Sequence, residues 1–429
     1  MTHMPVSLWR ETVSEPNPLD KLKLPANQPG DSADLAIIGG GFTGLSTALF
    51  AAKRDIDVQV FEAHDLGHGG SGRNVGLVNA GIWLLPSQTI AALGPTYGLR
   101  FMDKFAAGPE TVFDLIETHQ IKCDATRTGT IHAAHSPAGY ADLERRWFDW
   151  HRTGAPVDVL DRDEVTAKTG SDRFYGGLLD HRAGTINPMS YCHGLARVAL
   201  AAGARIARHC PVIRLEKQAG GWLVHSADHV MTAKKVVLAT NAYTDSLWPG
   251  LANSYMPIPY FQLATTPLGP RAGGILPGGQ GLWDTGRIMI SLRRDRDGRL
   301  IIGSMGPLIG TCHRGVSARW AHKTLTRLFP QLLGPVDFVS AWEGQIAMTA
   351  DHLPKIYQLD DGLFTPIGYN GRGITTGTLF GHSIAGLLAG DDPTHLPLPL
   401  TTMSREAGRR LGAILLRSIF AANQLAKSW

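Results

Sequence analysis

The sequence predicts an α/β fold, α+β overall, in which a discontinuous Rossmann-like nucleotide-binding domain carries an inserted, mostly antiparallel β domain. Residues 34–38 form a short apolar run that ends in three glycines, and the apolar residues after it recur at helical spacing. A second apolar run over residues 57–61 completes a βαβ unit of about thirty residues. Residues 255–344 alternate short apolar runs with Pro and Gly turns, which is typical of antiparallel strands.

These changes of pattern divide the chain into segments. Residues 1–30 are polar and punctuated by proline, and we expect them to form an N-terminal arm. The nucleotide-binding domain is expected in three pieces, 31–110, 183–250 and 346–395, and the substrate-binding domain in two, 111–182 and 251–345. Residues 396–429 are expected to form a C-terminal helical segment.

Composition excludes several classes of protein. The 429 residues are enough for about two to three domains with cores of their own. The formal net charge is only +4 and the basic residues are dispersed, so nucleic acid is not an expected partner. The four cysteines, Cys123, Cys192, Cys210 and Cys312, lie far apart without metal-ligand spacing. We expect reduced thiols and no metal site.

No apolar run is long enough for a transmembrane helix, and the N-terminus lacks the basic start and apolar core of a secretory signal. The longest candidate, residues 411–425, is interrupted by Arg417, Ser418 and Asn423, and its apolar residues follow helical spacing. It predicts an amphipathic terminal helix that packs on the protein, with contact to a membrane surface as the alternative. A cytoplasmic location is expected.

The glycine-rich turn after the first strand carries the first chemical motif. Gly39, Gly41 and Gly44 form GxGxxG, with Phe42 and Thr43 between them, at a junction of strand and helix. Gly39 permits the sharp turn, Gly41 lets the backbone approach a pyrophosphate, and Gly44 lets the helix pack against the strand. The pyrophosphate is expected at the positive end of the helix.

A carboxylate ends the second strand, about twenty residues beyond the glycine motif. Glu62, followed by Ala63, stands where a side chain accepts hydrogen bonds from a ribose 2′-hydroxyl and repels a 2′-phosphate. The position therefore favours FAD or NAD over NADP.

The segment after this strand decides between the two dinucleotides. Residues 37–44, Glu62 with Ala63, and the run Ser71-Gly72-Arg73-Asn74 resemble the D-amino-acid oxidase and glycine oxidase superfamily, closest to its γ-glutamylputrescine oxidoreductase branch. The resemblance implies an FAD fold of the glutathione-reductase type, with this run beneath the flavin. We expect Ser71 and Asn74 to bond the ribityl chain and ring edge, Gly72 and Gly76 to allow close approach, and Arg73 to offset phosphate charge.

The resemblance extends through most of the chain. It implies that Val212 passes the adenine and that Ala239, Thr240 and Asn241 form a second cofactor-binding turn. It also implies a final flavin loop at Gly371, Arg372, Gly373 and Ile374, where amides at a helix start face flavin N1 and O2 and stabilise the reduced ring. Asn74 stands where one branch has a flavin-linked histidine, and no cysteine lies near the final loop, so we expect non-covalent FAD.

The resembling enzymes take a substrate amine as its free base. Hydride moves from its α-carbon to flavin N5, and water hydrolyses the resulting imine. The candidate pocket residues are Tyr260, Gln262, Trp342, Gln345 and Arg372. Arg372 either holds a substrate carboxylate or pairs with a local acid. The γ-glutamylputrescine branch commonly has histidine at this position. Because this chain departs from that pattern, the resemblance does not imply that it shares the substrate of that branch.

The sequence thus predicts an FAD-dependent oxidase or dehydrogenase of a small amine or amino acid, with O₂ or a quinone- or dye-like molecule as electron acceptor. A flavin dehydrogenase of a hydroxy acid and a quinone-linked amino-acid dehydrogenase are the alternatives among enzymes. A non-catalytic flavin-binding subunit is the alternative from another class, and it would bind FAD without being reduced by any small substrate.

Overall fold

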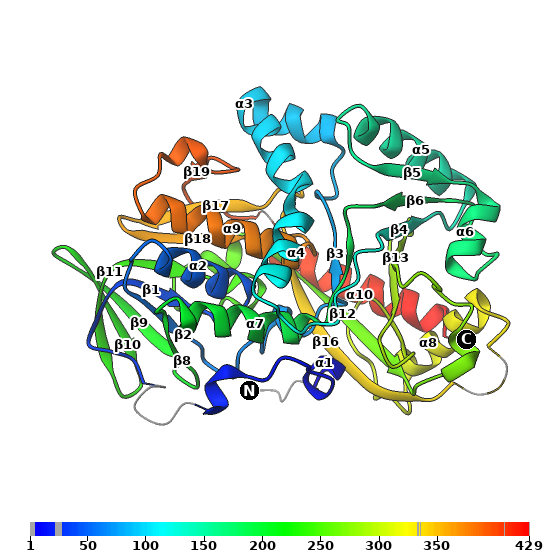
Figure 1. Cartoon of the computed structure of the whole chain (residues 1–429), viewed down its shortest axis with the longest axis horizontal. Coiled ribbons are helices and arrows are strands. Elements are labelled where there is room, and N and C mark those ends of the chain that lie inside the picture. The colour runs from blue at the N-terminus through cyan, green and yellow to red at the C-terminus, as the bar shows by residue number, and fades with distance from the viewer. Residues whose placement is uncertain (1–4, 22–27, 333, 335, 407, 429) are drawn as a thin grey trace.

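The computed structural model describes residues 5–21, 28–332, 334, 336–406 and 408–428. Two large β-sheets lie side by side, with helices around them (Figure 1). This arrangement confirms the predicted fold class, because one sheet has the parallel centre of a nucleotide-binding domain and the other is mostly antiparallel.

The first sheet is built around β1 (Ser32–Ile38), which pairs in parallel with β2 (Val58–Phe61) and β11 (Val230–Leu238). Its order is β19-β17-β18-β11-β1-β2-β8, and a β9-β10 hairpin extends it from β11. The remaining strands are β8 (Arg205–Ala207), β9 (Val212–Gln218), β10 (Gly221–Ser226), β17 (Lys355–Asp360), β18 (Leu363–Ile367) and β19 (Leu400–Thr401).

The second sheet has the order β16-β12-β15-β14-β13-β4-β6-β5, and only the β13-β4 pair within it is parallel among the described residues. Its strands are β4 (Thr130–Ala133), β5 (Val157–Leu160), β6 (Gly177–Asp180), β12 (Met256–Thr265), β13 (Gly281–Asp284), β14 (Ile290–Arg294), β15 (Leu300–Met305) and β16 (Phe338–Met348). These strands come from the two segments assigned to the substrate-binding domain by sequence, except that β16 continues to Met348, past the predicted boundary at residue 345. The domain boundaries themselves stay a prediction.

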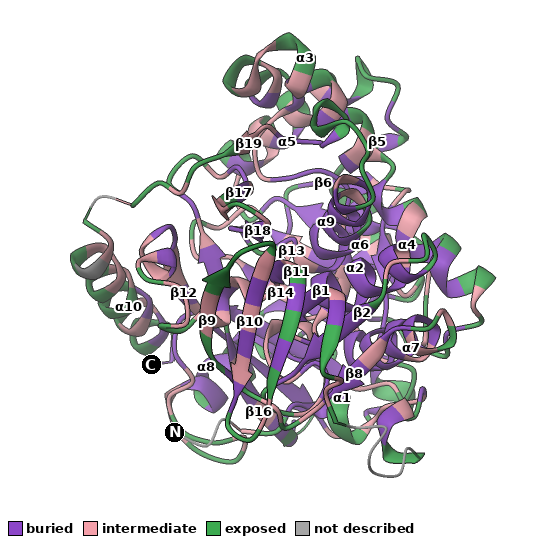
Figure 2. Ribbon diagram, turned by 90° about the vertical axis from the view of Figure 1, so that its left-hand side faces the viewer, coloured by how far each residue is buried: buried purple, intermediate pink, exposed green. Residues whose placement is uncertain are grey.

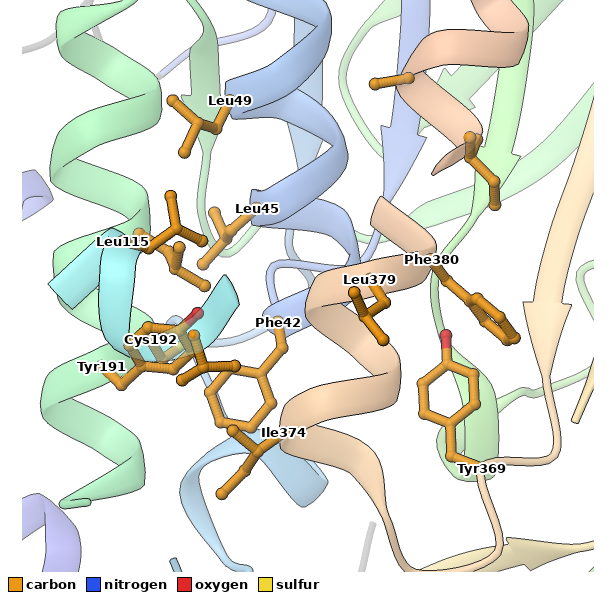
Figure 3. Close-up of a cluster of buried hydrophobic side chains, with 14 of the residues drawn as sticks. Phe42, Leu45, Leu49, Leu115, Tyr191, Cys192, Tyr369, Ile374, Leu379 and Phe380 are labelled. Carbon is orange, nitrogen blue, oxygen red and sulfur yellow. The ribbon is translucent and has the colours of Figure 1, made fainter. Parts of the chain in front are cut away.

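Three helices cover one face of the first sheet: α2 (Phe42–Ala52), α7 (Pro188–Ala201) and α9 (Gly373–Leu388). Successive side chains of strand β1 point to opposite faces of the sheet, and both faces are buried. Leu35 and Ile37 pack in the cluster that holds the helices, whereas Ala36 and Ile38 pack on the other face. Figure 3 shows the helical side, where side chains of α2, α7 and α9 meet. The turn at the end of β1 is thereby held in place.

The other helices surround this core. They are α1 (Leu8–Glu11), α3 (Pro86–Ala106), α4 (Gly108–Thr118), α5 (Pro137–His151), α6 (Arg162–Thr169), α8 (Val316–Leu328) and α10 (Arg409–Ala426), and β3 (Leu77–Val78) pairs with β7 (Gly184–Thr185). Within the described ranges, no helix combines the length and the apolar character that crossing a bilayer requires. Helix α10 confirms the predicted terminal helix, and it packs on β12 and α8.

Candidate active site

A cavity of about 930 Å³ opens at the carboxyl ends of β1 and β2, the place where such sheets bind ligands. Its walls come from segments far apart in the sequence. They include the turn after β1, the end of β2, residues 67–75, the turn after β11, the start of α9, and strands β12 to β16 of the second sheet. The cavity therefore joins the two sheets.

The GxGxxG turn forms one wall of the cavity. Gly39 has φ of 115°, a conformation that favours glycine, and a Cβ there would lie 3.0 Å from the carbonyl oxygen of Ala239. A Cβ on Gly41 would lie 2.7 Å from Ser71 Oγ, and one on Gly44 would overlap the carbonyl oxygen of Gly39. Gly39, Gly41, Phe42 and Thr43 line the cavity, whereas Gly44 serves the packing of α2 against β1. The sharp turn at Gly39 and the close packing at Gly44 are as expected, and the approach of a pyrophosphate to Gly41 stays a prediction.

Glu62 lies at the end of β2 and is buried. Its Oε2 accepts from the amide of Gly40 at 2.7 Å and its Oε1 from the amide of His64 at 2.8 Å. Burial raises the pKa of Glu62, and these two amide bonds oppose that rise. Each carboxylate oxygen keeps further acceptor capacity for a ribose hydroxyl. Ala63 and Val212 line the same cavity.

The side chain of Asn74 differs from its expected role. Its Nδ2 donates to the carbonyl oxygens of Gly70 and Ser71 at 2.9 and 3.1 Å, and its Oδ1 accepts from the amide of Gly76 at 2.8 Å. Both donor hydrogens are used within the loop. Asn74 therefore fixes the shape of this loop instead of donating to a flavin. Ser71 Oγ accepts from the amide of Phe42 at 3.0 Å and leaves its own hydrogen for a ligand at the start of α2.

Arg73 and the loop glycines make contacts that the sequence did not predict. Arg73 is buried, and its Nε and Nη1 donate to the carbonyl oxygens of Pro5, His68 and Glu343 at 2.7, 2.8 and 3.2 Å, so it ties three segments together. Arg73 also lines the cavity, and its role toward a phosphate stays a prediction. A Cβ on Gly72 would overlap Met189, and one on Gly76 would overlap the carbonyl oxygen of Ile186. Packing behind the loop explains both glycines, and Gly76 lies outside the cavity wall.

The N-terminal arm covers this loop, a contact that the sequence analysis missed. Ser7 Oγ donates to the carbonyl oxygen of Gly72, and Trp9 Nε1 donates to that of Asn74, each at 2.7 Å. The Trp9 ring meets the edge of Trp342 with centroids 6.1 Å apart. Leu8 and Trp9 are buried. The apolar pair Leu8-Trp9 in an otherwise polar arm is the sequence feature that could have indicated this contact.

The turn after β11 and the loop before α9 complete the wall. Ala239, Thr240 and Asn241 line the cavity, as do Gly371, Arg372, Gly373 and Ile374. Asn241 Oδ1 accepts from the amide of Gly368 at 3.0 Å, which joins the two turns. Helix α9 begins at Gly373, so its free amides and positive end face the cavity.

Arg372 is a buried cation without an acidic partner in the described part of the chain. Its Cζ lies 4.9 Å from the ring centre of Trp83 and 4.7 Å from that of Trp283, and its Nε has no hydrogen-bond partner among the described residues. Burial, and then the charge of Arg146, lower the pKa of Arg372 to about 10. The alternative of a local ion pair is therefore not what the structure shows.

Other substrate-pocket candidates separate into two groups. Tyr260, Gln262 and Gln345 line the cavity, and neither Tyr260 OH nor Gln262 Oε1 has a partner among the described residues. Trp342 was wrongly assigned to the pocket, because it is fully buried behind the wall and donates to the carbonyl oxygen of Arg73 at 2.8 Å. The sequence analysis missed Trp83 and Trp283, which reach the cavity from distant parts of the chain and have no shared motif.

The lining fits FAD held without a covalent bond. The glycine turn leaves room for a diphosphate at the start of α2, Glu62 offers acceptors to a ribose, and the start of α9 offers amides to a flavin. No cysteine is present in the described lining. The two histidines of the described lining are His64 and His68, and their ring centroids lie 4.0 Å apart. Both follow Glu62 closely in the sequence, at the end of the cavity where we expect the ribose.

Comparison with known proteins agrees with this geometry. The family model DAO, described as FAD dependent oxidoreductase, matches residues 34–387. Among curated relatives, the probable oxidoreductase OrdL of Rhizobium meliloti is 31% identical over 369 residues, and the gamma-glutamylputrescine oxidoreductase of Escherichia coli is 32% identical over 369 residues. Each of the two matches covers 84% of this chain and 84% of the relative.

Solved structures show the same fold. The glycine oxidase of Geobacillus kaustophilus superimposes with a TM-score of 0.73 at 22% identity and covers 88% of this chain and 100% of its own. The L-proline dehydrogenase of P. horikoshii gives a TM-score of 0.67 at 19% identity, over 84% of this chain and 94% of its own.

Proposed function

The chain belongs to the DAO family of FAD-dependent oxidoreductases, and from this premise we propose that it oxidises the C–N bond of a substrate that carries both an amine and a carboxylate. The protein is an enzyme that acts on amines or amino acids with FAD as its cofactor. The finer statement, that the substrate bears a carboxylate, depends on Arg372.

The proposal depends on the charge of Arg372, which has no acidic partner among the residues that the structure describes. A buried guanidinium is stable only where an anion or a set of acceptors compensates its lost hydration. The two tryptophan rings supply part of that compensation through cation–π contact. A substrate carboxylate would supply the rest, bound by paired N–H donors.

The other pocket residues supply polar contacts and exclude water. Tyr260 OH is buried and has no hydrogen-bond partner among the described residues, and burial raises its pKa strongly, so it stays a neutral donor. Trp83 and Trp283 meet edge to face at 5.2 Å and cover Arg372. FAD supplies the acceptor for the hydride that leaves the substrate α-carbon. The chain holds the substrate for this transfer through Arg372 and Tyr260, and water then hydrolyses the imine product.

The test is anaerobic reduction of the bound flavin by a matched substrate series. We expect amino acids to bleach the visible flavin absorption and the corresponding decarboxylated amines to do so far more slowly at equal concentration. Varying the number of carbons between amine and carboxylate then measures where the amine lies relative to Arg372. Equal reduction by the decarboxylated amines would show that no carboxylate anchor operates.

A 2-hydroxy acid is the second candidate substrate, because the same guanidinium suits its carboxylate. The two candidates differ in their products. Stoichiometric release of ammonia or of an amine supports C–N oxidation, whereas reduction of the flavin by hydroxy acids alone supports the alternative. Oxygen consumption with matching peroxide identifies an oxidase, and turnover with only a dye or quinone identifies a dehydrogenase.

A further inference from the structure

Helix α10 presents an apolar face to solvent. Five of its large side chains are exposed, between 45% and 78%: Leu411, Ile414, Leu415, Ile419 and Leu425. Their spacing of three, one, four and six residues keeps them on one broad side of a helix. Figure 2 shows α10 at the rim of the molecule, with exposed residues on its outer side.

The opposite side of α10 is fixed to the protein. Phe420 and Gln424 are buried, and Gln424 Nε2 donates to Ser317 Oγ of α8 at 2.8 Å. Arg409 Nε donates to the carbonyl oxygen of Tyr255 at 2.8 Å. The helix therefore holds its apolar face outward by specific contacts.

The two sequence segments that carry α8 and α10 contain no acidic residue. Neither residues 407–429 nor residues 298–336, which include α8, contain Asp or Glu, although the chain as a whole has 37 acidic and 41 basic residues. Helices α8 and α10 are in contact and lie side by side (Figure 1). Arg417 on α10 and Lys427 just after it are exposed, as are Lys323 and Arg327 on α8. The exposed apolar side chains are thus bordered by positive charge.

We propose that α8 and α10 form a docking surface for the headgroup region of an anionic lipid bilayer. The apolar side chains of α10 enter the boundary between headgroups and acyl chains, and the flanking cations approach acidic headgroups. Charge decides between this partner and a second copy of the chain. A symmetric contact through α10 would bring two acid-free, cationic helices together, which like-charge repulsion opposes.

Vesicle sedimentation of the purified holoenzyme tests this proposal. We expect binding to vesicles of phosphatidylcholine mixed with phosphatidylglycerol, weaker binding to phosphatidylcholine alone, and a decline as salt increases. The double variant Leu411→Gln/Leu415→Gln should lower the partition coefficient at least about tenfold, because two apolar side chains no longer enter the bilayer. Arg417→Gln/Lys427→Gln should lower it about tenfold or more on the anionic vesicles only.

Ile213→Gln is the matched control. Ile213 is 62% exposed on β9. Strand β9 lies at the left of Figure 1, whereas α10 runs from near the centre to the right. It should bind vesicles like the wild type, and all variants should keep their flavin absorption and turnover in solution. Absence of vesicle binding by the wild type overturns the proposal. So does equal binding by the leucine variant, or a wild-type dimer in sedimentation that this variant dissociates without any vesicle binding.

Discussion

At the scale of single residues, Arg372 affects both the folding stability of the protein and its selectivity for a carboxylate substrate. Its guanidinium is buried between Trp83 and Trp283 without an acidic partner among the described residues. Such a charge costs folding free energy that a bound carboxylate returns. Proteins keep residues of this kind where function depends on them.

Replacing Arg372 by methionine separates these two effects. We expect Arg372→Met to weaken binding of a carboxylate substrate by about 30-fold or more, equivalent to about 2 kcal/mol, while the thermal midpoint of the substrate-free enzyme stays equal or rises. Flavin bleaching titrations and thermal unfolding measure the two quantities. Arg145→Met is the control, because that exposed arginine lies in a surface pair with Asp142. A lower midpoint with unchanged affinity would mean that Arg372 has a structural role.

The protonation of Arg372 predicts a pH dependence. Burial lowers the pKa of Arg372 to about 10, so the cation that binds a carboxylate is present at neutral pH and is lost as the pH rises through about 10. A carboxylate inhibitor without an amine should therefore bind evenly around neutral pH and weaken above about pH 10. Tyr260 does not contribute, since its pKa is raised well above its usual value. A constant affinity through pH 11 would contradict this assignment.

The sequence located the residues of the cofactor wall better than it assigned their roles. Glu62 and the glycine turn act through the backbone geometry of one βαβ unit, which is visible locally. Asn74 and Arg73 were placed correctly on the wall. The Asn74 side chain binds carbonyl oxygens of its own loop, whereas Arg73 also binds those that the fold brings from Pro5 and Glu343. Such partners are distant in sequence, so no local pattern predicts them.

At the scale of elements, the N-terminal arm forms part of the cavity wall, where Val6, Ser7 and Arg10 lie. Its helix α1 lies on the loop that carries Ser71 to Asn74, and residues of the arm precede the region matched by the family model. The β1-α2-β2 unit was predictable because its hydrophobic period is local. The docking of the arm was not, since it depends on Trp9 meeting Trp342 across the fold.

Weakening this arm should loosen the cofactor. Trp9→Ala removes a fully buried ring and its bond to Asn74, so we expect a loss of about 3–5 kcal/mol in stability and faster release of FAD on dilution or mild heating. Flavin fluorescence reports that release. Trp9→Phe keeps most of the packing and should show a smaller effect. If Trp9→Ala unfolds earlier but retains FAD as tightly while folded, then the arm only stabilises the fold.

At the scale of the whole molecule, the cavity is the junction between two sheets. The first sheet contributes the glycine turn and Glu62, and the second contributes Tyr260, Gln262 and Trp283. The presence of two sheets followed from the change in hydrophobic period along the sequence. Their relative placement, which puts Trp283 beside Arg372, is set by packing among distant segments and had no local signal.

Because residues of both sheets line the cavity, we expect bound FAD to stabilise both sheets together. A ligand that binds only the folded state adds about 2.7 kcal/mol at a free concentration of one hundred times its dissociation constant. Apoprotein should therefore unfold at a lower temperature, and its midpoint should rise steadily with added FAD. We expect the adenosine of FAD to lie beside Glu62. FMN lacks this adenosine and should raise the midpoint much less, and Glu62→Gln should weaken the response to FAD. Equal stabilisation by FMN and FAD would show that the ribose end of the cavity contributes little to binding, and would remove Glu62 from the site.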